Sequence, residues 1–274
     1  MEEQKSVIDL SIIMPALNEE EDISRAIRDT LQALSDYGLQ GEIIVVNDGS
    51  TDETANIVND LAGHEMTRRI RMVHHKTPQG LGMAFRDGAM EARGDVVAFM
   101  PGDGENDPGE IMRYFSLMDQ VDMVVPFVYN KEVRPKIRNL ISTIFRMIVN
   151  LTFGVNFNYT NGTVLYRRVI LDSNPNKSRG FFFQTENVVR AVWSGYLFAE
   201  APYRLEVRSG GESKAISWKS LAEVIRNYLS LTKEIYFSPE KKADRKPARG
   251  TISDLRRIET QKIGFGIPGK YSRE

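Results

Sequence analysis

The N-terminal part of the chain alternates between β-branched apolar runs and stretches with a helical hydrophobic period, and this alternation is the strongest constraint on the fold. In the intervening stretches, apolar residues recur at spacings of three and four, as Ile23, Ile27 and Leu31 do before Gly38. Strands that alternate with helices through short connections form a mostly parallel sheet with right-handed crossovers. We therefore expect an α/β, Rossmann-like fold in which helices flank a mostly parallel sheet. The expected strands cover residues 7–14, 42–46, 70–75 and 95–100.

The second half of the chain has a different pattern. A strand is expected at 121–129, and the helix after it carries a stripe of apolar residues from Ile137 to Ile148. Two more strands are expected around a helix near 184–193, and an amphipathic helix follows them. From Ser238 the composition shifts to Lys, Arg, Gly and Pro, which predicts a mobile tail. We therefore expect three parts, which are a main domain at 1–215, an amphipathic helical segment at 216–238 and a basic, mobile tail at 239–274.

Composition excludes several classes of protein. The 274 residues include no cysteine, so disulfides, thiolate metal sites and cysteine nucleophiles are excluded, and three histidines make a His-rich metal site unexpected. A net charge of −1 provides no general attraction for nucleic acid. The N-terminus has no apolar signal-peptide core, and no apolar run approaches the ~18 residues of a membrane span. A cytoplasmic protein is the expectation.

Three polar turns follow expected strands, at Pro15–Glu19, Asn47–Asp52 and Gly102–Asp107. In open α/β sheets, ligands bind beyond the carboxyl ends of the strands, so these turns should converge on one site. Ser50 and Glu53 are expected to form a capping box for the helix after the second turn, and the simpler alternative is that this turn has no other role. A partial dinucleotide fingerprint at Gly80–Phe85 lacks its third glycine and follows the third strand. It is therefore better explained as a loop that turns into a helix.

Two charged segments suggest a site for phosphates and a metal. In the turn "PGDGENDPGE", three acids alternate at Asp103, Glu105 and Asp107. Mg²⁺ and Mn²⁺ bind carboxylates together with substrate phosphates, although a solvated acidic turn needs no metal. In "RSGGESK", Arg208 and Lys214 flank a glycine pair, which suits a diphosphate but also fits a basic surface loop.

Taken together, these motifs resemble a known family. The segments "SIIMPALNEEEDI", "IIVVNDGSTDET", "GLGMAFRDGAMEARGDVVAFM", "NGTVLYRR" and "RSGGESK" occur in the order and spacing of family 2 glycosyltransferases. The chain is most similar to the dolichol-phosphate mannose synthase and polyprenyl-phosphate glycosyltransferase group, over roughly residues 7–215. The resemblance implies a GT-A fold, an inverting metal-dependent hexosyltransferase, a GDP- or UDP-sugar donor, Mg²⁺ or Mn²⁺, and a polyprenyl (dolichyl or undecaprenyl) phosphate acceptor at a membrane.

The resemblance also implies roles for individual residues. Asp103 and Glu105 would hold the metal, and Asp103 and Arg138 would act in catalysis by stabilising the diphosphate leaving group. The residues implied in donor binding are Pro15, Leu17, Glu19, Val46, Asp48, Gly102, Asp103, Arg138, Arg208 and Lys214. Within this set, Val46 and Asp48 would contact the base, and Arg208 and Lys214 would bind the diphosphate.

The sequence departs from the family at four positions. Leu17 stands where many members have Tyr, Asn47 replaces an acid, and Val128 replaces an arginine. Pro101 occupies the first position of the family's Asp-x-Asp metal motif and cannot ligate. Glu105, in place of a neutral Gln, could compensate for it.

Three alternatives follow from these features. A phosphate acceptor is already ionised and needs no general base, whereas a sugar or small-molecule hydroxyl acceptor of a soluble family 2 enzyme would need one, for which Glu186 is the candidate. The third alternative is a degenerate, non-catalytic nucleotide-sugar binding protein, because Pro101 removes one of the family's metal ligands. The stripes at 137–151 and 221–237 could lie on the cytoplasmic face of a membrane, next to the basic tail, or simply pack on the domain.

Overall fold

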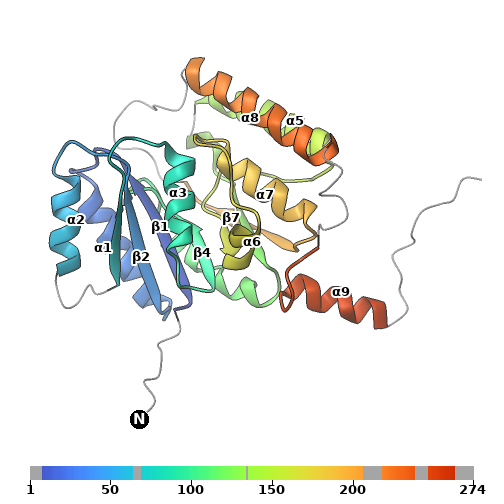
Figure 1. Cartoon of the computed structure of the whole chain (residues 1–274), viewed down its shortest axis with the longest axis horizontal. Helices are drawn as coiled ribbons and strands as arrows, with labels where there is room; N and C mark the ends of the chain where they lie inside the picture. Colours follow the sequence, from blue (N-terminus) through green and yellow to red (C-terminus); the bar gives the residue numbers. More distant parts are fainter. Residues whose placement is uncertain (1–7, 64–68, 134, 206–217, 238–245, 263–274) are drawn as a thin grey trace, which may run out of the picture.

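The computed structural model describes residues 8–63, 69–133, 135–205, 218–237 and 246–262 (Figure 1). In the described part of the chain, seven strands form one sheet in the order β3-β2-β1-β4-β6-β5-β7. Only β6 runs antiparallel to its neighbours, so the expected mostly parallel sheet is confirmed. The strands are β1 (Leu10–Ala16), β2 (Gly41–Asn47), β3 (Ile70–His74), β4 (Val96–Phe99), β5 (Met123–Val128), β6 (Leu165–Arg167) and β7 (Phe198–Tyr203).

Helices cover both faces of the sheet and close two separate cores. Alternate residues of one strand face opposite cores, as Ile12 and Ile13 of β1 do. One core joins the sheet to α1 and α2, and the other joins it to α3 and α7. The helices are α1 (Ile23–Asp36), α2 (Thr54–Gly63), α3 (Leu81–Met90), α4 (Gly109–Met112), α5 (Lys136–Phe153), α6 (Arg168–Ser173), α7 (Phe183–Trp193), α8 (Trp218–Phe237) and α9 (Ile252–Lys262).

The glycines at the start of α3 permit a close approach of two loops. Gly80 has φ +97°, and Gly82 N donates a hydrogen bond of 2.6 Å to Arg179 O. A Cβ atom on Gly82 would lie 2.1 Å from Ser178 O, so no larger residue fits there without moving the backbone. The glycines therefore serve the turn into α3, as the sequence indicated, and also the packing of the 176–180 loop on it.

Helix α8 is anchored to the domain by a buried ion network. Arg190 of α7 lies 2.8 Å from Glu186 of α7 and 2.8 Å from Glu234 of α8. Burial opposes the charge of Arg190, but the hydrogen bond to Glu234 and the charges of both carboxylates outweigh it and raise the pKa of the guanidinium. At the other end of α8, Glu223 accepts a hydrogen bond of 2.8 Å from Gly180 N. These contacts hold α8 beside α5, where Thr152 and Tyr228 form a 2.6 Å hydrogen bond.

Part of the segment expected as a basic tail folds onto the domain as α9. The fully buried Asp122 accepts hydrogen bonds from Ile252 N (3.0 Å) and Ser253 N (2.8 Å) at the start of this helix. A carboxylate at a helix N-terminus satisfies free amides and interacts favourably with the helix dipole. The composition of this segment did not indicate a helix, because its strongest contacts lie in a distant part of the chain.

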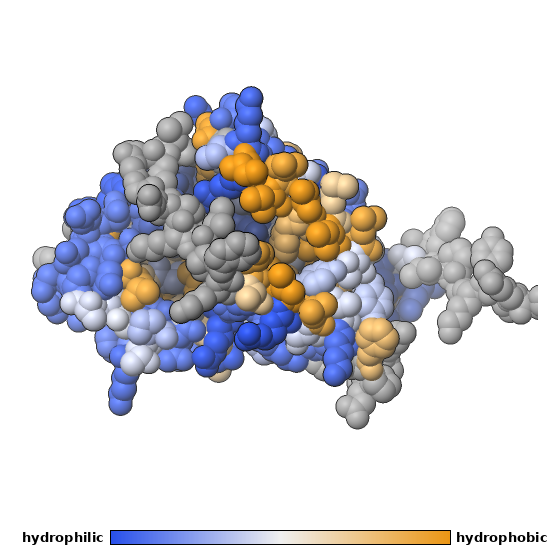
Figure 2. All heavy atoms as spheres, turned by 90° about the horizontal axis from the view of Figure 1, so that it is seen from above, coloured by the Kyte–Doolittle hydropathy of each residue, from blue (hydrophilic) through white to orange (hydrophobic). Residues whose placement is uncertain are grey.

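Helices α5 and α8 expose a continuous series of apolar side chains, which we call the apolar ridge (Figure 2). Patches of this kind mark protein or membrane contacts on soluble domains. The ridge consists of Ile137, Leu140, Ile141, Ile144, Met147, Ile148 and Leu151 on α5 and of Leu221, Ile225, Leu229 and Phe237 on α8. Only part of the predicted stripe packs inward, as Phe145 does against Phe182. Within the described ranges, no helix has both the length and the apolar character that crossing a bilayer requires.

Candidate functional site

The carboxyl ends of β1, β2 and β4 meet at one edge of the sheet, as the sequence predicted. Pro15 pairs in register with Val46 of β2, and Asp48 N donates a 2.9 Å hydrogen bond to Ala16 O. From the other side, Gly102 N donates a 3.0 Å hydrogen bond to Pro15 O. The three polar turns therefore lie next to one another.

The first two turns are connected by hydrogen bonds between backbone and side chains. Asn18 N donates to Ser50 Oγ (3.0 Å), Glu19 N to Thr54 Oγ1 (2.9 Å) and Glu20 N to Asp52 Oδ2 (3.2 Å). Burial opposes ionisation of Asp52, but hydrogen bonds from Thr54 and Glu20 outweigh it and lower the pKa of this carboxyl. These contacts make the two turns one rigid unit.

The predicted capping box at the start of α2 is wrong. Ser50 Oγ accepts from Asn18 N instead of capping the helix, while Glu53 N donates 2.9 Å to Glu20 Oε2. Asp52 takes the capping role, since its Oδ1 accepts from Thr54 N at 3.1 Å. The tertiary contact with the first turn outweighs the local capping preference of Ser50.

The residues expected around the nucleoside have different environments. Val46 is fully buried between β1 and β3, and its side chain packs towards Gly88 of α3. Leu17 is 38% exposed and directly follows β1. Glu19 is half-buried and precedes α1, and its carbonyl accepts a 2.8 Å hydrogen bond from the N–H of Ile23, the first residue of that helix.

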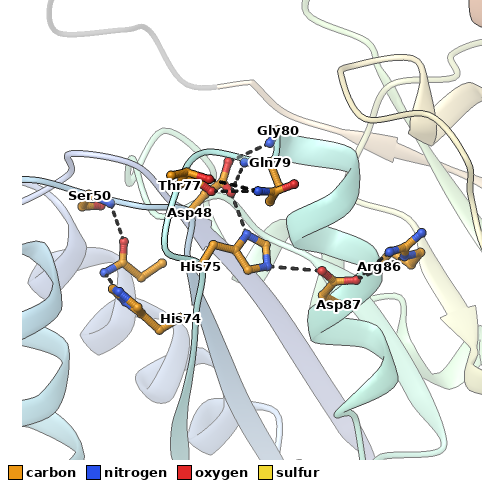
Figure 3. A network of polar contacts seen from close by, with 10 residues as sticks. Asp48, Ser50, His74, His75, Thr77, Gln79, Gly80, Arg86 and Asp87 are labelled. Atoms are coloured by element: carbon orange, nitrogen blue, oxygen red, sulfur yellow. Dashed lines mark hydrogen bonds and ion pairs between the residues drawn. The ribbon is translucent and has the colours of Figure 1, made fainter.

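Asp48 lies at the centre of a polar network formed by the loop after β3 (Figure 3). Its carboxylate accepts hydrogen bonds from Gln79 N (2.7 Å), Gly80 N (2.9 Å) and His75 Nδ1 (2.7 Å). On the other side of the imidazole ring, His75 Nε2 lies 3.2 Å from Asp87 Oδ2, and Asp87 in turn pairs with Arg86 at 3.1 Å. Asp48 is thus a buried carboxylate that fixes the 75–80 loop beside the end of β2.

The acidic turn after β4 is compact and half-buried. Asp103 Oδ1 accepts 3.0 Å from Glu105 N, which keeps both carboxylates on the same turn. Gly102 is buried, and a Cβ there would lie 2.7 Å from Ile23 Cδ1. Arg25 of α1 lies along the turn, and the pKa of its guanidinium is raised by the hydrogen bond to Asp22 and by nearby charges that include Asp103.

The carboxylates of this turn fit a divalent cation that takes its other ligands from a substrate. Mg²⁺ is usually held by one or two carboxylates, with phosphates and water completing the octahedron. Asp103 and Glu105 supply two such carboxylates, while Pro101 supplies none. Within the described residues, no three potential ligand side chains cluster in a way that would hold a metal without substrate.

The end of β7 is fixed against the acidic turn. Tyr203 donates a 3.0 Å hydrogen bond to Asn106, and Arg204 N donates 2.7 Å to Glu110. Asn130 binds both backbone groups of Leu205, at 2.8 and 2.9 Å. The chain therefore leaves β7 next to the turn that carries Asp103. Arg208 and Lys214 lie beyond this point, outside the described residues.

Arg138 and Glu186 have separate positions. Arg138 is half-buried in the first turn of α5, and the described contacts do not join it to the acidic turn. Glu186 is 2% exposed and accepts hydrogen bonds from Lys177 N (3.0 Å), Ser178 N (2.9 Å) and Arg190 Nε (2.9 Å). Its carboxylate is occupied by structural partners, which argues against a role as general base.

Sequence reasoning did not identify His75 or Arg25. His75 could have been noticed as a histidine directly after a strand that ends beside "NDGS", but its partner Asp87 is on a different element. Arg25 lies on the outer surface of α1, where a charged residue is expected in any case.

A doubly covered, mostly parallel sheet with one antiparallel strand and polar turns at the ends of β1, β2 and β4 defines a GT-A glycosyltransferase fold. The profile of the glycosyl transferase family 2 matches residues 11–181, and the chain belongs to this family. It is 30% identical over 168 residues to an undecaprenyl-phosphate 4-deoxy-4-formamido-L-arabinose transferase of Pseudomonas fluorescens, covering 60% of this chain and 48% of that protein. It is 28% identical to a dodecaprenyl-phosphate galacturonate synthase of Rhizobium johnstonii, covering 60% and 49%. The chain thus spans about half the length of these relatives.

Solved structures support the fold. A glucosyl-3-phosphoglycerate synthase from Mycobacterium tuberculosis, crystallised with Mn²⁺, UDP-glucose and phosphoglyceric acid, superimposes with a TM-score of 0.61. The match covers 82% of this chain and 80% of that chain at 18% sequence identity. The predicted GT-A architecture and the predicted family are both confirmed.

Proposed function

We propose that this chain transfers a sugar from a nucleoside-diphosphate sugar to the phosphate of a polyprenyl lipid. The observation that carries the proposal is the apolar ridge, because a soluble enzyme with a small polar acceptor has no need of it. Two relatives are named for undecaprenyl-phosphate and dodecaprenyl-phosphate substrates, which agrees with a lipid acceptor. UDP is the favoured nucleotide, since the structurally similar synthase was crystallised with UDP-glucose.

The ridge fits the surface of a bilayer. Ile137, Ile144 and Leu151 are 64%, 50% and 82% exposed and lie along one side of α5. An amphipathic helix of this kind lies in the membrane interface with its apolar side among the acyl chains. In Figure 1, α5 and α8 lie at the end of the molecule towards which the parallel strands run. A membrane bound there would present a lipid phosphate near the edge that carries the site, and the enzyme would be peripheral, on the cytoplasmic face.

Donor binding is assigned to the turns at the ends of β1, β2 and β4. The connected first and second turns form one wall for the nucleoside, next to Pro15 and Asp48. The acidic turn lies on the other side of Pro15 from these two turns. A diphosphate bound between the acidic turn and the first two turns would therefore reach Asp103. Rigid turns of this kind place a bound group without a large cost in conformational entropy.

The transfer reaction develops negative charge on the departing diphosphate. A divalent cation held by Asp103 and Glu105 would stabilise that charge when it is bound. Arg138, Arg208 and Lys214 are assigned the same electrostatic role from the protein side. A phosphate acceptor is ionised at neutral pH, so attack on the anomeric carbon requires no general base. The full occupation of the Glu186 carboxylate agrees with this chemistry.

The test is transfer of radiolabelled sugar from a UDP-sugar to undecaprenyl phosphate in anionic lipid vesicles, together with vesicle co-sedimentation. Ile144→Glu on the ridge and Leu255→Glu on α9 are a matched pair, since both side chains are 50% exposed. We expect Ile144→Glu to reduce vesicle binding and transfer strongly, and Leu255→Glu to leave both unchanged. Equal behaviour of the two variants would contradict the assigned orientation. Lack of transfer with any sugar, despite nucleotide binding, would instead favour a non-catalytic binder.

A further inference from the structure

His75 is buried between two carboxylates that belong to different elements (Figure 3). Its ring lies at the carboxyl end of β3, with Nδ1 2.7 Å from Asp48 Oδ1 and Nε2 3.2 Å from Asp87 Oδ2. The side chain of His75 is only 10% exposed. A carboxylate only accepts hydrogen bonds, so Nδ1 carries a proton and donates it to Asp48. The ring therefore hydrogen-bonds the end of β2 through Nδ1, and its Nε2 faces Asp87 of α3.

The hydrogen bonds of Asp48 leave a defined capacity for a further donor. Oδ1 accepts from both His75 Nδ1 and Gln79 N, which uses the two lone pairs of that atom. Among the residues that the structure describes, Oδ2 accepts from Gly80 N alone. A donor from a bound ligand can therefore be accepted only at Oδ2. The imide N–H of uracil is such a donor, and an orientation fixed by three partners makes its direction specific.

We propose that His75 is a positioning residue for the nucleobase of the donor. It saturates Oδ1 of Asp48, aligns the carboxylate, and so keeps Oδ2 as the acceptor for the base. Asp87, which is itself paired with Arg86, lies 3.2 Å from Nε2 on the opposite side of the ring. The inference rests on the proposed function, because it takes Asp48 as the contact of a nucleotide base.

The neighbouring histidine provides an internal comparison. His74 is exposed, and its Nδ1 lies 3.2 Å from Asn47 Nδ2, whereas His75 contacts the charged Asp48. His74 is the last residue of β3 and His75 is the next residue, and the two have the same side chain. A loss of nucleotide binding that follows His75 but not His74 is therefore attributable to the contact with Asp48.

The experiment compares His75→Ala, His75→Asn and the control His74→Ala in the full chain by calorimetric titration with UDP and with pyrophosphate, in the presence of Mg²⁺. Loss of a buried hydrogen bond to a charged group predicts a roughly tenfold or greater increase of the UDP Kd in His75→Ala. The Asn amide nitrogen occupies nearly the position of Nδ1 in His, so His75→Asn should bind UDP within about threefold of wild type. Pyrophosphate, which has no base, should bind all variants alike.

Each result decides the question. Equal UDP affinity in His75→Ala and His74→Ala overturns the inference, and so does a parallel loss of UDP and pyrophosphate binding, which indicates general damage to the fold. If His75→Ala does not fold, His75→Asn alone decides, because a tenfold loss in that variant contradicts a role that needs only the donor to Asp48. If wild-type protein binds neither UDP nor GDP, the proposed function itself fails and the inference fails with it.

Discussion

Replacing Gly82 by alanine is expected to destabilise the protein more than any other single methyl addition in the 80–82 loop. The new Cβ would lie 2.1 Å from Ser178 O and 3.0 Å from both Arg179 O and Phe183 Cβ. Two of these three atoms are backbone oxygens, which cannot move away by a rotamer change. The 176–180 loop must therefore shift as a unit.

The magnitude follows from the contacts that this shift changes. Overpacking of a close-packed interior costs about 1–3 kcal/mol. Moving the loop also weakens the 2.6 Å hydrogen bond from Gly82 N to Arg179 O, which adds about 1 kcal/mol. The sum, about 2–4 kcal/mol, corresponds to a melting temperature that is lower by roughly 4–16 °C for a chain of this size.

Gly63→Ala is the matched control, since a Cβ at this helical position meets nothing within 4 Å. Gly63 is the last residue of α2, so Gly63→Ala should change the unfolding free energy by less than about 0.5 kcal/mol. Urea unfolding gives both free energies under the same conditions. The reasoning is refuted if Gly82→Ala is as stable as wild type. A second readout is UDP affinity, which should fall in Gly82→Ala only, because the displaced 176–180 loop packs against Gly80, a hydrogen-bond partner of Asp48.

Three further predictions concern the charged groups. Arg190→Met should cost about 3–5 kcal/mol of unfolding free energy, because the carboxylates of Glu186 and Glu234 stay buried without their cation. Lys177→Met should cost less than about 1 kcal/mol, because the Lys177 side chain is 62% exposed. Similar urea midpoints for the two variants would contradict the stabilising role of the buried ion network. The pKa of Asp52 is lowered in the folded state, so the Asp52 carboxylate contributes its full stabilisation above the ordinary pKa of Asp. This stabilisation is lost as pH falls through the pKa of Asp52 in the folded protein. The difference in unfolding free energy between wild type and Asp52→Asn should therefore shrink below about pH 4 in acid unfolding curves. Glu105→Gln should weaken Mg²⁺ or Mn²⁺ binding in the presence of UDP by about tenfold, and unchanged calorimetric affinity would remove Glu105 from the metal site.

The sequence was most informative where the structure depends on local pattern. Apolar β-branched runs located the strands, and apolar spacings of three and four residues located most of the helices. The alternation of the two predicted the mostly parallel sheet. The strand-end turns converge as predicted because parallel strands leave a sheet on the same edge. The reversed direction of β6 between β4 and β5 was not predicted, since a three-residue strand carries no signal of its direction.

The errors arise where a distant contact outweighs a local preference. Ser50 has the sequence context of a cap but binds Asn18 of another turn. The role of Glu186 stayed open at the sequence level for a similar reason, since Arg190 and the 177–178 backbone, which bind its carboxylate, are not evident from its local context. α9 forms in a segment of low apolar content, because Asp122, which is 130 residues away, binds its first amides. No pattern within a short window contains information about these partners.

The anchoring of α9 also fixes where attached groups would lie. Asp122 and Leu197 precede β5 and β7, which run parallel to each other, so α9 starts at the amino edge of the sheet. The apolar ridge lies at the other end of the molecule (Figure 1). With the ridge on a vesicle, α9 would stand away from the lipid by about the height of the sheet. A fluorophore at Leu255 would then remain in water and resist quenching by lipid-bound probes, while one at Leu151 would be quenched, so that two labels on one chain report the tilt of the domain on its membrane.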